Sequence, residues 1–277
     1  MLKLVCIGVL YLSLGCHVEG NWCYGREECK PNTWPQNYPT CGNSSQSPIN
    51  IINSEVQLDN NLQRIHIFGW SRPSTGVVTN NGHTVEVVLS ADYFLAGAGL
   101  PNVYKFAGFH LHFGSLLAGE GSEHQIDGQA YPLEVHFVFY NTEYVDLATA
   151  ETKPDGLAVV GVLFEIGETH GELQNLVNVL SDVAYQGQSA TISIRLSKLL
   201  LHTEQNFYKY QGSLTTPPCS ENVAWHVIRI PQQLSSDQYE AIVSSLYFTS
   251  STSVEKIPMV NNFRPVQPLN GRIVYRK

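Results

Sequence analysis

The runs FHLHF at residues 109–113 and LEVHFVF at residues 133–139 decide the fold expected for this chain of 277 residues. Such short runs of aromatic and branched apolar residues are typical of β-strands. Because side chains alternate between the faces of a strand, His110 and His112 point to one side of the first run. For the same reason, Glu134 and His136 share one side of the second run. If the two strands are antiparallel neighbours, the three imidazoles converge.

Three neutral nitrogen ligands with a fourth position left open form the ligand set of a catalytic zinc ion. The spacing His-x-His is a weak signal by itself, because most strand histidines fill ordinary core or surface positions. Glu134 strengthens the signal, since a histidine that binds metal commonly donates its second N–H to a carboxylate. The pattern therefore predicts a zinc hydrolase or hydratase. A zinc protease is disfavoured because the sequence contains no His-Glu-x-x-His.

Further β-type runs alternate with turn signals such as Asn81-Gly82 along the chain. Together with the two runs above, the predicted strands lie at residues 63–68, 84–89, 106–113, 133–140, 157–166, 190–194 and 223–230. Helical periodicity is weaker and is best at residues 171–182 and 236–247. Because strands dominate and do not alternate with helices, we expect a mainly β protein (α+β by content). The expected architecture is a single domain with a large, twisted, mostly antiparallel central sheet of about ten strands and short peripheral helices.

The first 20 residues have the features of a secretory signal peptide. Lys3 precedes an apolar run at residues 4–14, and small and polar residues end at Gly20. That run is too short to span a bilayer, and residues 269–277 lack the hydrophobic tail of a lipid-anchor signal. We therefore expect a signal peptide over residues 1–20, one folded domain over residues 21–277, no transmembrane segment, and a soluble, secreted, extracellular product.

The charge of the chain argues against nucleic acid as a partner. The net charge is −8, and charged residues make up 14% of the sequence without a run of like charges, so there is no basic surface for phosphates. Residues 21–48 are rich in Pro, Asn, Gly and Ser, which is typical of irregular surface structure. Asn43 begins a glycosylation sequon within that segment. The sequence does not specify an oligomeric state.

Four cysteines remain once the signal peptide is removed: Cys23, Cys29, Cys41 and Cys219. An even number in an oxidising compartment favours two disulfides, with three possible connectivities. A four-cysteine zinc site is the alternative, but these spacings match no zinc-finger pattern.

Eight segments of the chain, taken in order, resemble those of the α-class carbonic anhydrases. They are WCYG (22–25), QSPINI (46–51), NNGH (80–83), HLH (110–112), GSEH (121–124), EVH (134–136), GSLTTPP (212–218) and NFRP (262–265). The resemblance runs nearly from Trp22 to the C-terminus and implies a carbonic anhydrase catalytic domain over residues 21–277. The cysteines resemble those of the secreted, extracellular branch of the family, which implies the bonds Cys23–Cys29 and Cys41–Cys219.

The resemblance also implies a mechanism, the reversible hydration of carbon dioxide to bicarbonate and a proton. Zn²⁺ lowers the pKa of a bound water, and the resulting hydroxide attacks carbon dioxide. Thr215 accepts a hydrogen bond from that hydroxide and donates its own proton to Glu123. Thr216 lines the bicarbonate position. The implied zinc ligands are His110, His112 and His136.

Other implied roles belong to residues around the metal. His83 matches the proton shuttle, since an imidazole titrates near neutral pH, and Tyr24 and Asn81 would hold its water chain. Without the resemblance, Asn81-Gly82-His83 is the tip of a hairpin. The residues implied as outer hydrogen-bond partners are Glu134, His124, Asn262 and Tyr210. The residues implied as the apolar wall for carbon dioxide are Val138, Val159, Leu214, Val223 and Trp225, which are otherwise ordinary core residues.

Two positions depart from the family. Gly108 stands where a Gln usually accepts a hydrogen bond from the first zinc histidine, and Phe113 stands where Trp is usual. Loss of such a partner typically costs about 10–100-fold in metal affinity or activity, unless water or backbone replaces it. A strand glycine also often marks a close backbone approach. The alternative function is therefore a low-activity or non-catalytic extracellular matrix or binding module on this fold. We favour the enzyme because the three histidines, Thr215 and Glu123 are all present.

Overall fold

The computed structural model describes residues 22–200 and 206–277. The expected signal peptide lies outside these residues. The main sheet contains 13 strands and a small second sheet pairs β1 with β8. The strands are β1 (Asn50–Ile51), β2 (Gln57–Leu58), β3 (Ile65–Phe68), β4 (Ser74–Asn80), β5 (Val85–Leu89), β6 (Phe94–Gly97), β7 (Tyr104–Phe113), β8 (Gln125–Ile126), β9 (Leu133–Asn141), β10 (Leu157–Ile166), β11 (Ser189–Ile194), β12 (Phe207–Gly212), β13 (Val223–Ile228), β14 (Gln232–Leu234) and β15 (Tyr275–Arg276).

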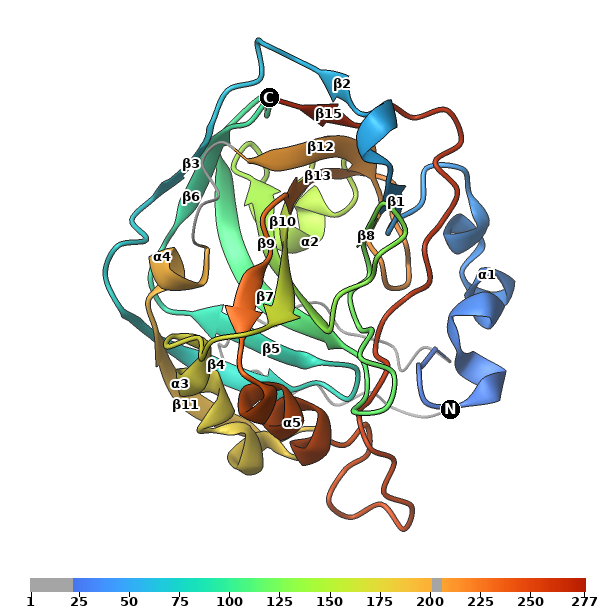
Figure 1. Ribbon diagram of the computed structural model, residues 1–277, viewed down its shortest axis with the longest axis vertical. Helices are drawn as coiled ribbons and strands as arrows, with labels where there is room; N and C mark the ends of the chain where they lie inside the picture. Colours follow the sequence, from blue (N-terminus) through green and yellow to red (C-terminus); the bar gives the residue numbers. More distant parts are fainter. Residues whose placement is uncertain (1–21, 201–205) are drawn as a thin grey trace, which may run out of the picture.

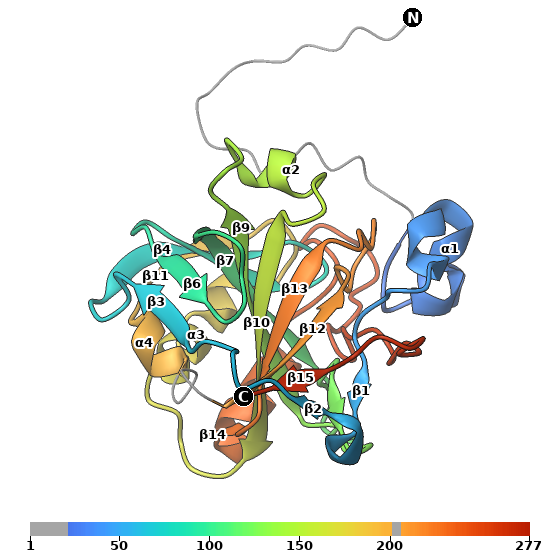
Figure 2. The ribbon, with the colours of Figure 1, turned by 90° about the horizontal axis from the view of Figure 1, so that it is seen from above.

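The main sheet runs in the order β11-β4-β5-β7-β9-β10-β13-β12-β15-β2, with β3, β6 and β14 attached to it. Its long central strands cross the middle of the molecule in Figure 1, and Figure 2 shows how strongly they twist against one another. Most pairs are antiparallel, and β10 is parallel to β13 and β14. The predicted fold class is confirmed. The expected number of about ten strands was low because two-residue strands such as β2 and β15 leave no alternation in the sequence.

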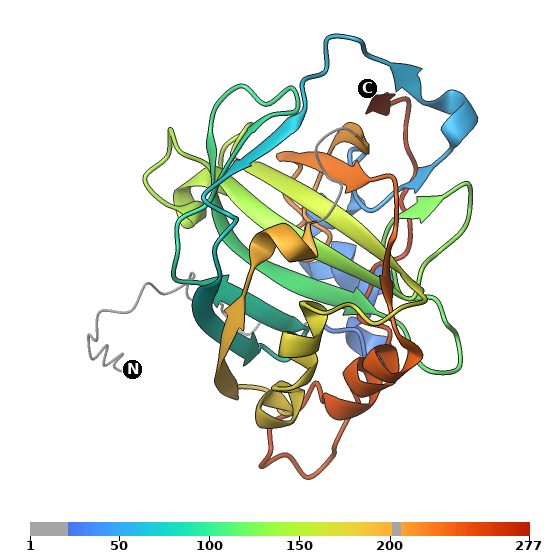
Figure 3. The same cartoon turned by 60° about the vertical axis from the view of Figure 1, so that its left-hand side comes forward.

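The helices are short and peripheral, as expected. They are α1 (Trp34–Asn37), α2 (Leu147–Ala150), α3 (Leu173–Val177), α4 (Leu196–Leu199) and α5 (Ser236–Ser245), with 3₁₀ turns at Glu27–Cys29, Pro31–Thr33, Pro39–Gly42, Asn53–Glu55 and Leu180–Val183. In Figure 3, α3 and α5 lie beside each other below the sheet. Within the ranges that the structure describes, no helix is long and apolar enough to span a membrane.

The two predicted helices differ in how far they form. Ser235 caps α5, accepting a hydrogen bond from the Gln238 amide while the Gln238 side chain accepts one from the Ser235 amide. The predicted helix at residues 171–182 is broken into α3 and the 3₁₀ turn at 180–183. At the break, Val179 leaves the α region with φ −111° and ψ 2°. Asn and β-branched Val are weak helix formers, so tertiary packing of Leu180 and Val183 decides the local path.

The central strands separate two apolar clusters. Along β9, Val135 and Phe137 pack into the larger cluster, whereas Val138 faces the smaller one. The same alternation on β7 buries Phe109 and Leu111 in the larger cluster. The histidines therefore point to the other face, toward the cluster that contains Trp225.

Two disulfides are present, Cys23–Cys29 and Cys41–Cys219. The second bond joins positions 178 residues apart and packs with Trp34. Closing so long a loop restricts the unfolded chain, which the chain-entropy model values at about 4–5 kcal/mol. It fixes the loop after β12, which carries Thr215 and Thr216, to the N-terminal segment.

Candidate metal centre

Strands β7 and β9 bring three imidazoles together. Their antiparallel register pairs His110 with His136 and His112 with Glu134. One ring nitrogen from each of the three histidines lies within 4.8 Å of the others. His112 and His136 are buried, and His110 is partly exposed. The predicted convergence of these side chains is therefore present in the structure.

Glu134 fixes which nitrogen of His136 is available. Its carboxylate accepts four N–H groups: the amides of Glu123 and His124 at 2.9 and 2.7 Å, and the rings of His124 and His136 at 2.7 and 2.8 Å. Burial favours a neutral acid, but His124 and His136 outweigh it and hold the pKa of Glu134 well below its usual range. An ionised carboxylate only accepts hydrogen bonds. His136 therefore carries its proton on Nε2, which leaves the Nδ1 lone pair for a metal.

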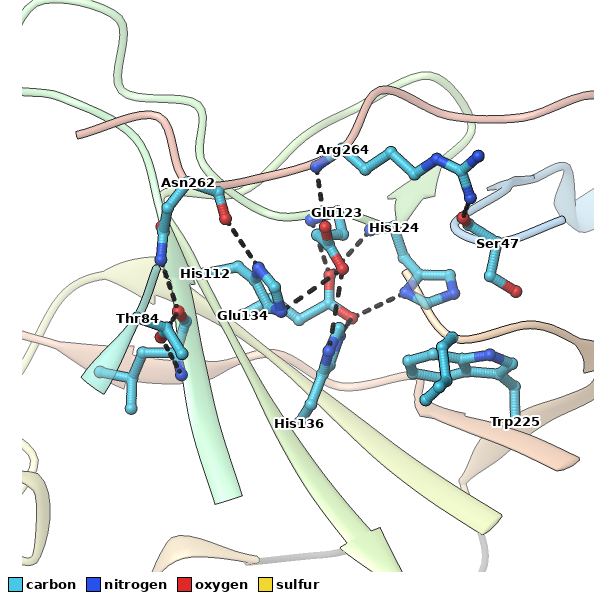
Figure 4. A network of polar contacts seen from close by, with 12 residues as sticks. Ser47, Thr84, His112, Glu123, His124, Glu134, His136, Trp225, Asn262 and Arg264 are labelled. Carbon is cyan, nitrogen blue, oxygen red and sulfur yellow. Dashed lines mark hydrogen bonds and ion pairs between the residues drawn. The ribbon is translucent and has the colours of Figure 1, made fainter. Parts of the chain in front are cut away.

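A backbone carbonyl fixes the tautomer of His112 in a similar way. Its Nδ1 lies 2.8 Å from the carbonyl oxygen of Asn262, which can only accept. The Nε2 lone pair of His112 therefore faces the other histidines, and this buried atom has no hydrogen-bond partner among the described residues. Figure 4 shows His112, Glu134 and His136 turned toward one another beneath Glu123.

The three imidazoles are neutral at physiological pH. Burial lowers the pKa of His110 well below its usual value, and the two neighbouring histidines add to this effect. Burial also lowers the pKa of His112 to about 4, against the opposing hydrogen bond to Asn262. For His136, burial outweighs the opposing effect of Glu134. Neutral imidazole is the form that binds metal, so three converging lone pairs, one of them buried and unpartnered, fit a zinc ion.

A second group, His124, Glu134 and His136, also has ligand atoms close together. Here both rings already donate to the carboxylate, and His124 Nε2 lies 2.7 Å from the hydroxyl of Tyr210. That hydroxyl in turn lies 2.8 Å from Ser47 Oγ. Because these atoms satisfy one another, this group is a hydrogen-bond network that supports His136 rather than a metal site.

Glu123 borders the three nitrogens. Its Oε2 atom lies 3.4 Å from His112 Nε2 and 3.8 Å from His136 Nδ1, and its Oε1 accepts the amide of Arg264 at 2.8 Å. Burial raises the pKa of Glu123 to about 7, while His136 and the nearby Thr215 side chain oppose the rise. The Oε2 atom of Glu123 is buried and has no hydrogen-bond partner among the described residues. Thr215 and Thr216 follow each other on the loop after β12.

Two supporting residues were not identified from the sequence. Arg264 is buried and donates to Gln46 Oε1 and to the carbonyls of Ser47 and Cys41, which fixes the amide that it offers to Glu123. Gly161 leaves room for Glu134, because a Cβ there would lie 2.9 Å from Glu134 Oε1. A glycine inside an apolar strand signals such a close approach, whereas nothing local marks Arg264 except its place in NFRP.

His83 lies in the loop between β4 and β5, at the tip that Asn81-Gly82 predicts. Its ring stacks on Trp22 with centroids 3.8 Å apart. Asn81 uses its side-chain oxygen to accept the amides of His83 and Thr84 at 3.0 and 2.9 Å, so it shapes the turn. The Tyr24 hydroxyl is buried without a hydrogen-bond partner among the described residues, and its ring packs beside Trp22.

The five apolar residues assigned to a substrate wall lie together in the smaller cluster. Val159 on β10 is paired with Val138 on β9 and with Trp225 on β13. The Trp225 ring lies 4.8 Å from the ring of His136, centroid to centroid. These side chains form one apolar surface beside the histidines. The remaining members of that surface are Leu214 and Val223. Asn43, the predicted glycosylation site, is exposed.

Gly108 is a position of close approach. The pairing of β7 with β9 shifts register between Phe106 and Gly108, which places a bulge there. A Cβ at Gly108 would lie 2.9 Å from the backbone oxygen of Val87 on β5. No described residue hydrogen-bonds the ring of His110, in contrast to His112 and His136.

Replacing Gly108 by Gln is expected to lower the free energy of unfolding rather than restore a missing contact. The clash is with backbone, which cannot move away as a side chain does, and overpacking of this kind costs about 1–3 kcal/mol. Denaturant unfolding of the zinc-free protein measures this change in the free energy of unfolding. Gly171→Gln is the matched control, because a Cβ at Gly171 meets no atom within 4 Å. Equal stability of Gly108→Gln and the unmodified protein would contradict the steric account.

The comparisons with known proteins identify the family of the chain. The family model of eukaryotic-type carbonic anhydrases matches residues 29–277. Carbonic anhydrase 7 of Mus musculus is 40% identical over 257 residues, which are 91% of this chain and 96% of that protein. Carbonic anhydrase 12 of Homo sapiens is 38% identical over 248 residues, 88% of this chain and 70% of that protein. Carbonic anhydrase 3 of Mus musculus is 36% identical over 251 residues, which are 88% of this chain and 94% of that protein. The chain therefore belongs to the eukaryotic-type carbonic anhydrase family and is an enzyme of that family.

Proposed function

We propose that this enzyme hydrates carbon dioxide reversibly with a zinc ion held by His110, His112 and His136. The observation that carries the proposal is the pair of hydrogen bonds from His136 to Glu134 and from His112 to Asn262, which directs two nitrogen lone pairs to one point. Zinc, when bound, acts as a Lewis acid that makes hydroxide available from water near neutral pH, a property for which carbonic anhydrase itself is the standard example.

The chain's own residues orient and enclose the reaction. The Thr215 side chain lies near Glu123, whose Oε1 atom receives the Arg264 amide. In the proposed function, Glu123 accepts a hydrogen bond from the Thr215 hydroxyl. The lone pairs of the Thr215 oxygen then face the attacking oxygen. Such a fixed acceptor stabilises the geometry of attack without reorganisation. Thr216 is proposed to contact bicarbonate.

Carbon dioxide is uncharged and donates no hydrogen bond, so an apolar surface suits it. Val138, Val159 and Trp225 supply such a surface beside His136. His83 is proposed to carry the released proton outward, because an imidazole exchanges protons near neutral pH. His83 is partly exposed on the loop between β4 and β5, and its ring stacks on Trp22, which supports that role.

We also propose that the protein is secreted after loss of residues 1–20. Disulfides persist in oxidising compartments, and the bonds Cys23–Cys29 and Cys41–Cys219 support this location. In that compartment the exposed Asn43 sequon is an acceptor for glycosylation.

Metal removal tests the proposed function. The purified protein is expected to contain one zinc per chain and to hydrate carbon dioxide in stopped flow. Dialysis against dipicolinate should abolish hydration, and one equivalent of Zn²⁺ should restore it. Hydration at the same rate in zinc-free protein, or a zinc-loaded protein without activity, would overturn the proposal.

A further inference from the structure

Asn80 is the last residue of β4 and directly precedes the loop that carries His83. Its side chain is fully buried, although asparagine is mostly found at protein surfaces. Burying an amide costs free energy unless hydrogen bonds replace those that it made to water. The partners of Asn80 therefore show what this residue holds in place.

The side chain of Asn80 makes three hydrogen bonds. Its Oδ1 atom accepts the amide of Gly82 at 2.9 Å, which closes an Asx turn at the start of the loop. Its Nδ2 atom donates to the carbonyl oxygens of Ala184 and Tyr247, both at 3.1 Å. These carbonyls are 104 and 167 residues away along the chain. One side chain thus shapes the turn and attaches it to two distant segments.

The backbone of Asn80 adds two hydrogen bonds to the first of these segments. Its amide donates to the carbonyl of Gln188 at 3.0 Å, and its carbonyl accepts the amide of Gly187 at 2.8 Å. Gly82 also approaches this segment, since a Cβ there would lie 2.7 Å from the side chain of Gln186. The start of the loop is therefore packed onto residues 184–188.

Asn262 holds the same loop from the side of the metal centre. Its Nδ2 atom donates to the carbonyl of His83 at 3.1 Å, while its own carbonyl oxygen lies 2.8 Å from His112 Nδ1. The loop is thus attached through Asn262 on one side and through Asn80 on the other. Loss of Asn80 should let His83 move, whereas His112 keeps its partner.

We propose that Asn80 is a positioning residue for His83, which fixes the distance from the His83 ring to the metal centre. The proposal rests on the proposed function of His83 in carrying the released proton outward. A proton passes between two groups only when they, or the water between them, lie within hydrogen-bond distance. A displacement of about 1 Å can therefore cost about 100-fold in rate.

The kinetics of Asn80→Ala separate positioning from a general loss of structure. In dilute buffer, kcat for hydration includes loss of the proton from the enzyme, whereas kcat/KM covers only the steps up to the release of bicarbonate. We expect kcat in dilute buffer to fall about 10- to 100-fold, with zinc content and kcat/KM unchanged. Excess imidazole should restore kcat, because it accepts the proton without the help of His83.

Asn141→Ala is the matched control. Asn141 is equally buried, its Oδ1 atom accepts the amide of Glu143, and its Nδ2 atom donates to the backbone and side-chain oxygens of Asp155. Its loss should lower the free energy of unfolding without changing the ratio of kcat to kcat/KM. If Asn80→Ala instead lowers kcat and kcat/KM in equal proportion, Asn80 has only a structural role and the proposal is overturned.

Proton NMR of the zinc-free protein gives a readout that does not depend on activity. The rings of His83 and Trp22 are stacked with centroids 3.8 Å apart, so a nuclear Overhauser effect between their protons is expected. Asn80→Ala should lose this effect, and Asn141→Ala should keep it. An Asn80→Ala protein that keeps both the ring contact and the unmodified kcat in dilute buffer would overturn the proposal.

A second variant covers the case in which Asn80→Ala does not fold. Asn80→Ser keeps a short oxygen acceptor for the Gly82 amide but removes the amide group that donates to the two distant carbonyls. It should lose the contact between His83 and Trp22 as well, and an unchanged contact overturns the proposal. If His83→Ala leaves kcat in dilute buffer unchanged, the proposed proton transfer by His83 is refuted instead. The ring contact still decides whether Asn80 positions His83.

Discussion

Replacing His136 by Ala is expected to abolish both zinc binding and carbon dioxide hydration. His136 is the ligand whose ring is most firmly fixed, because Glu134 holds Nε2 at 2.8 Å and the Trp225 ring packs beside it. Two imidazoles alone leave an incomplete ligand set for a catalytic zinc. Zinc content by atomic absorption and stopped-flow hydration measure the two losses.

The variant should remain folded, because the core residues of β9 lie on the opposite face. Far-ultraviolet circular dichroism checks this. His66→Ala removes an exposed strand histidine and serves as the control for nonspecific zinc. If the His136→Ala protein contained no zinc and still hydrated carbon dioxide at the rate of the unmodified protein, the zinc mechanism would be refuted.

Replacing Thr215 by Ala is expected to lower turnover by about 10- to 1,000-fold, by analogy with the loss of a fixed hydrogen-bonding group from a transition state. Zinc should stay bound, since Thr215 contacts Glu123 and not the ligand rings in the proposed arrangement. The measurement is kcat for hydration at constant zinc content.

Thr215→Ser is the matched variant, because it keeps the hydroxyl and removes only a methyl group. It should retain most of the turnover. If Thr215→Ala and Thr215→Ser both turn over like the unmodified enzyme, then the contact between Thr215 and Glu123 has no part in orienting the nucleophile.

Predictions from local pattern succeeded where one short run contains the information. The alternation in FHLHF and LEVHFVF places His110 with His112 and Glu134 with His136 on single faces, and the structure has both arrangements. The capped helix at Ser236–Ser245 formed as its periodicity indicated, ending two residues early where Tyr247 pairs with Pro258. The helix predicted at 171–182 is interrupted, because its helical periodicity is weak and the packing of Leu180 and Val183 determines the local backbone path.

What the sequence by itself determined is therefore the fold class, the faces of the strands and, through resemblance, the family and its expected ligand set. The tertiary structure decided which strands are neighbours, because strand pairing is set by contacts distant in the chain. It placed the Asn262 carbonyl on His112 across 150 residues and the Arg264 amide on Glu123 across 141. Because nearly every residue has these backbone groups, the amino-acid sequence does not indicate which of them will contact a site residue. The backbone pairing of Glu86 with His110 has the same origin, because it exists only through the register that β5 and β7 share.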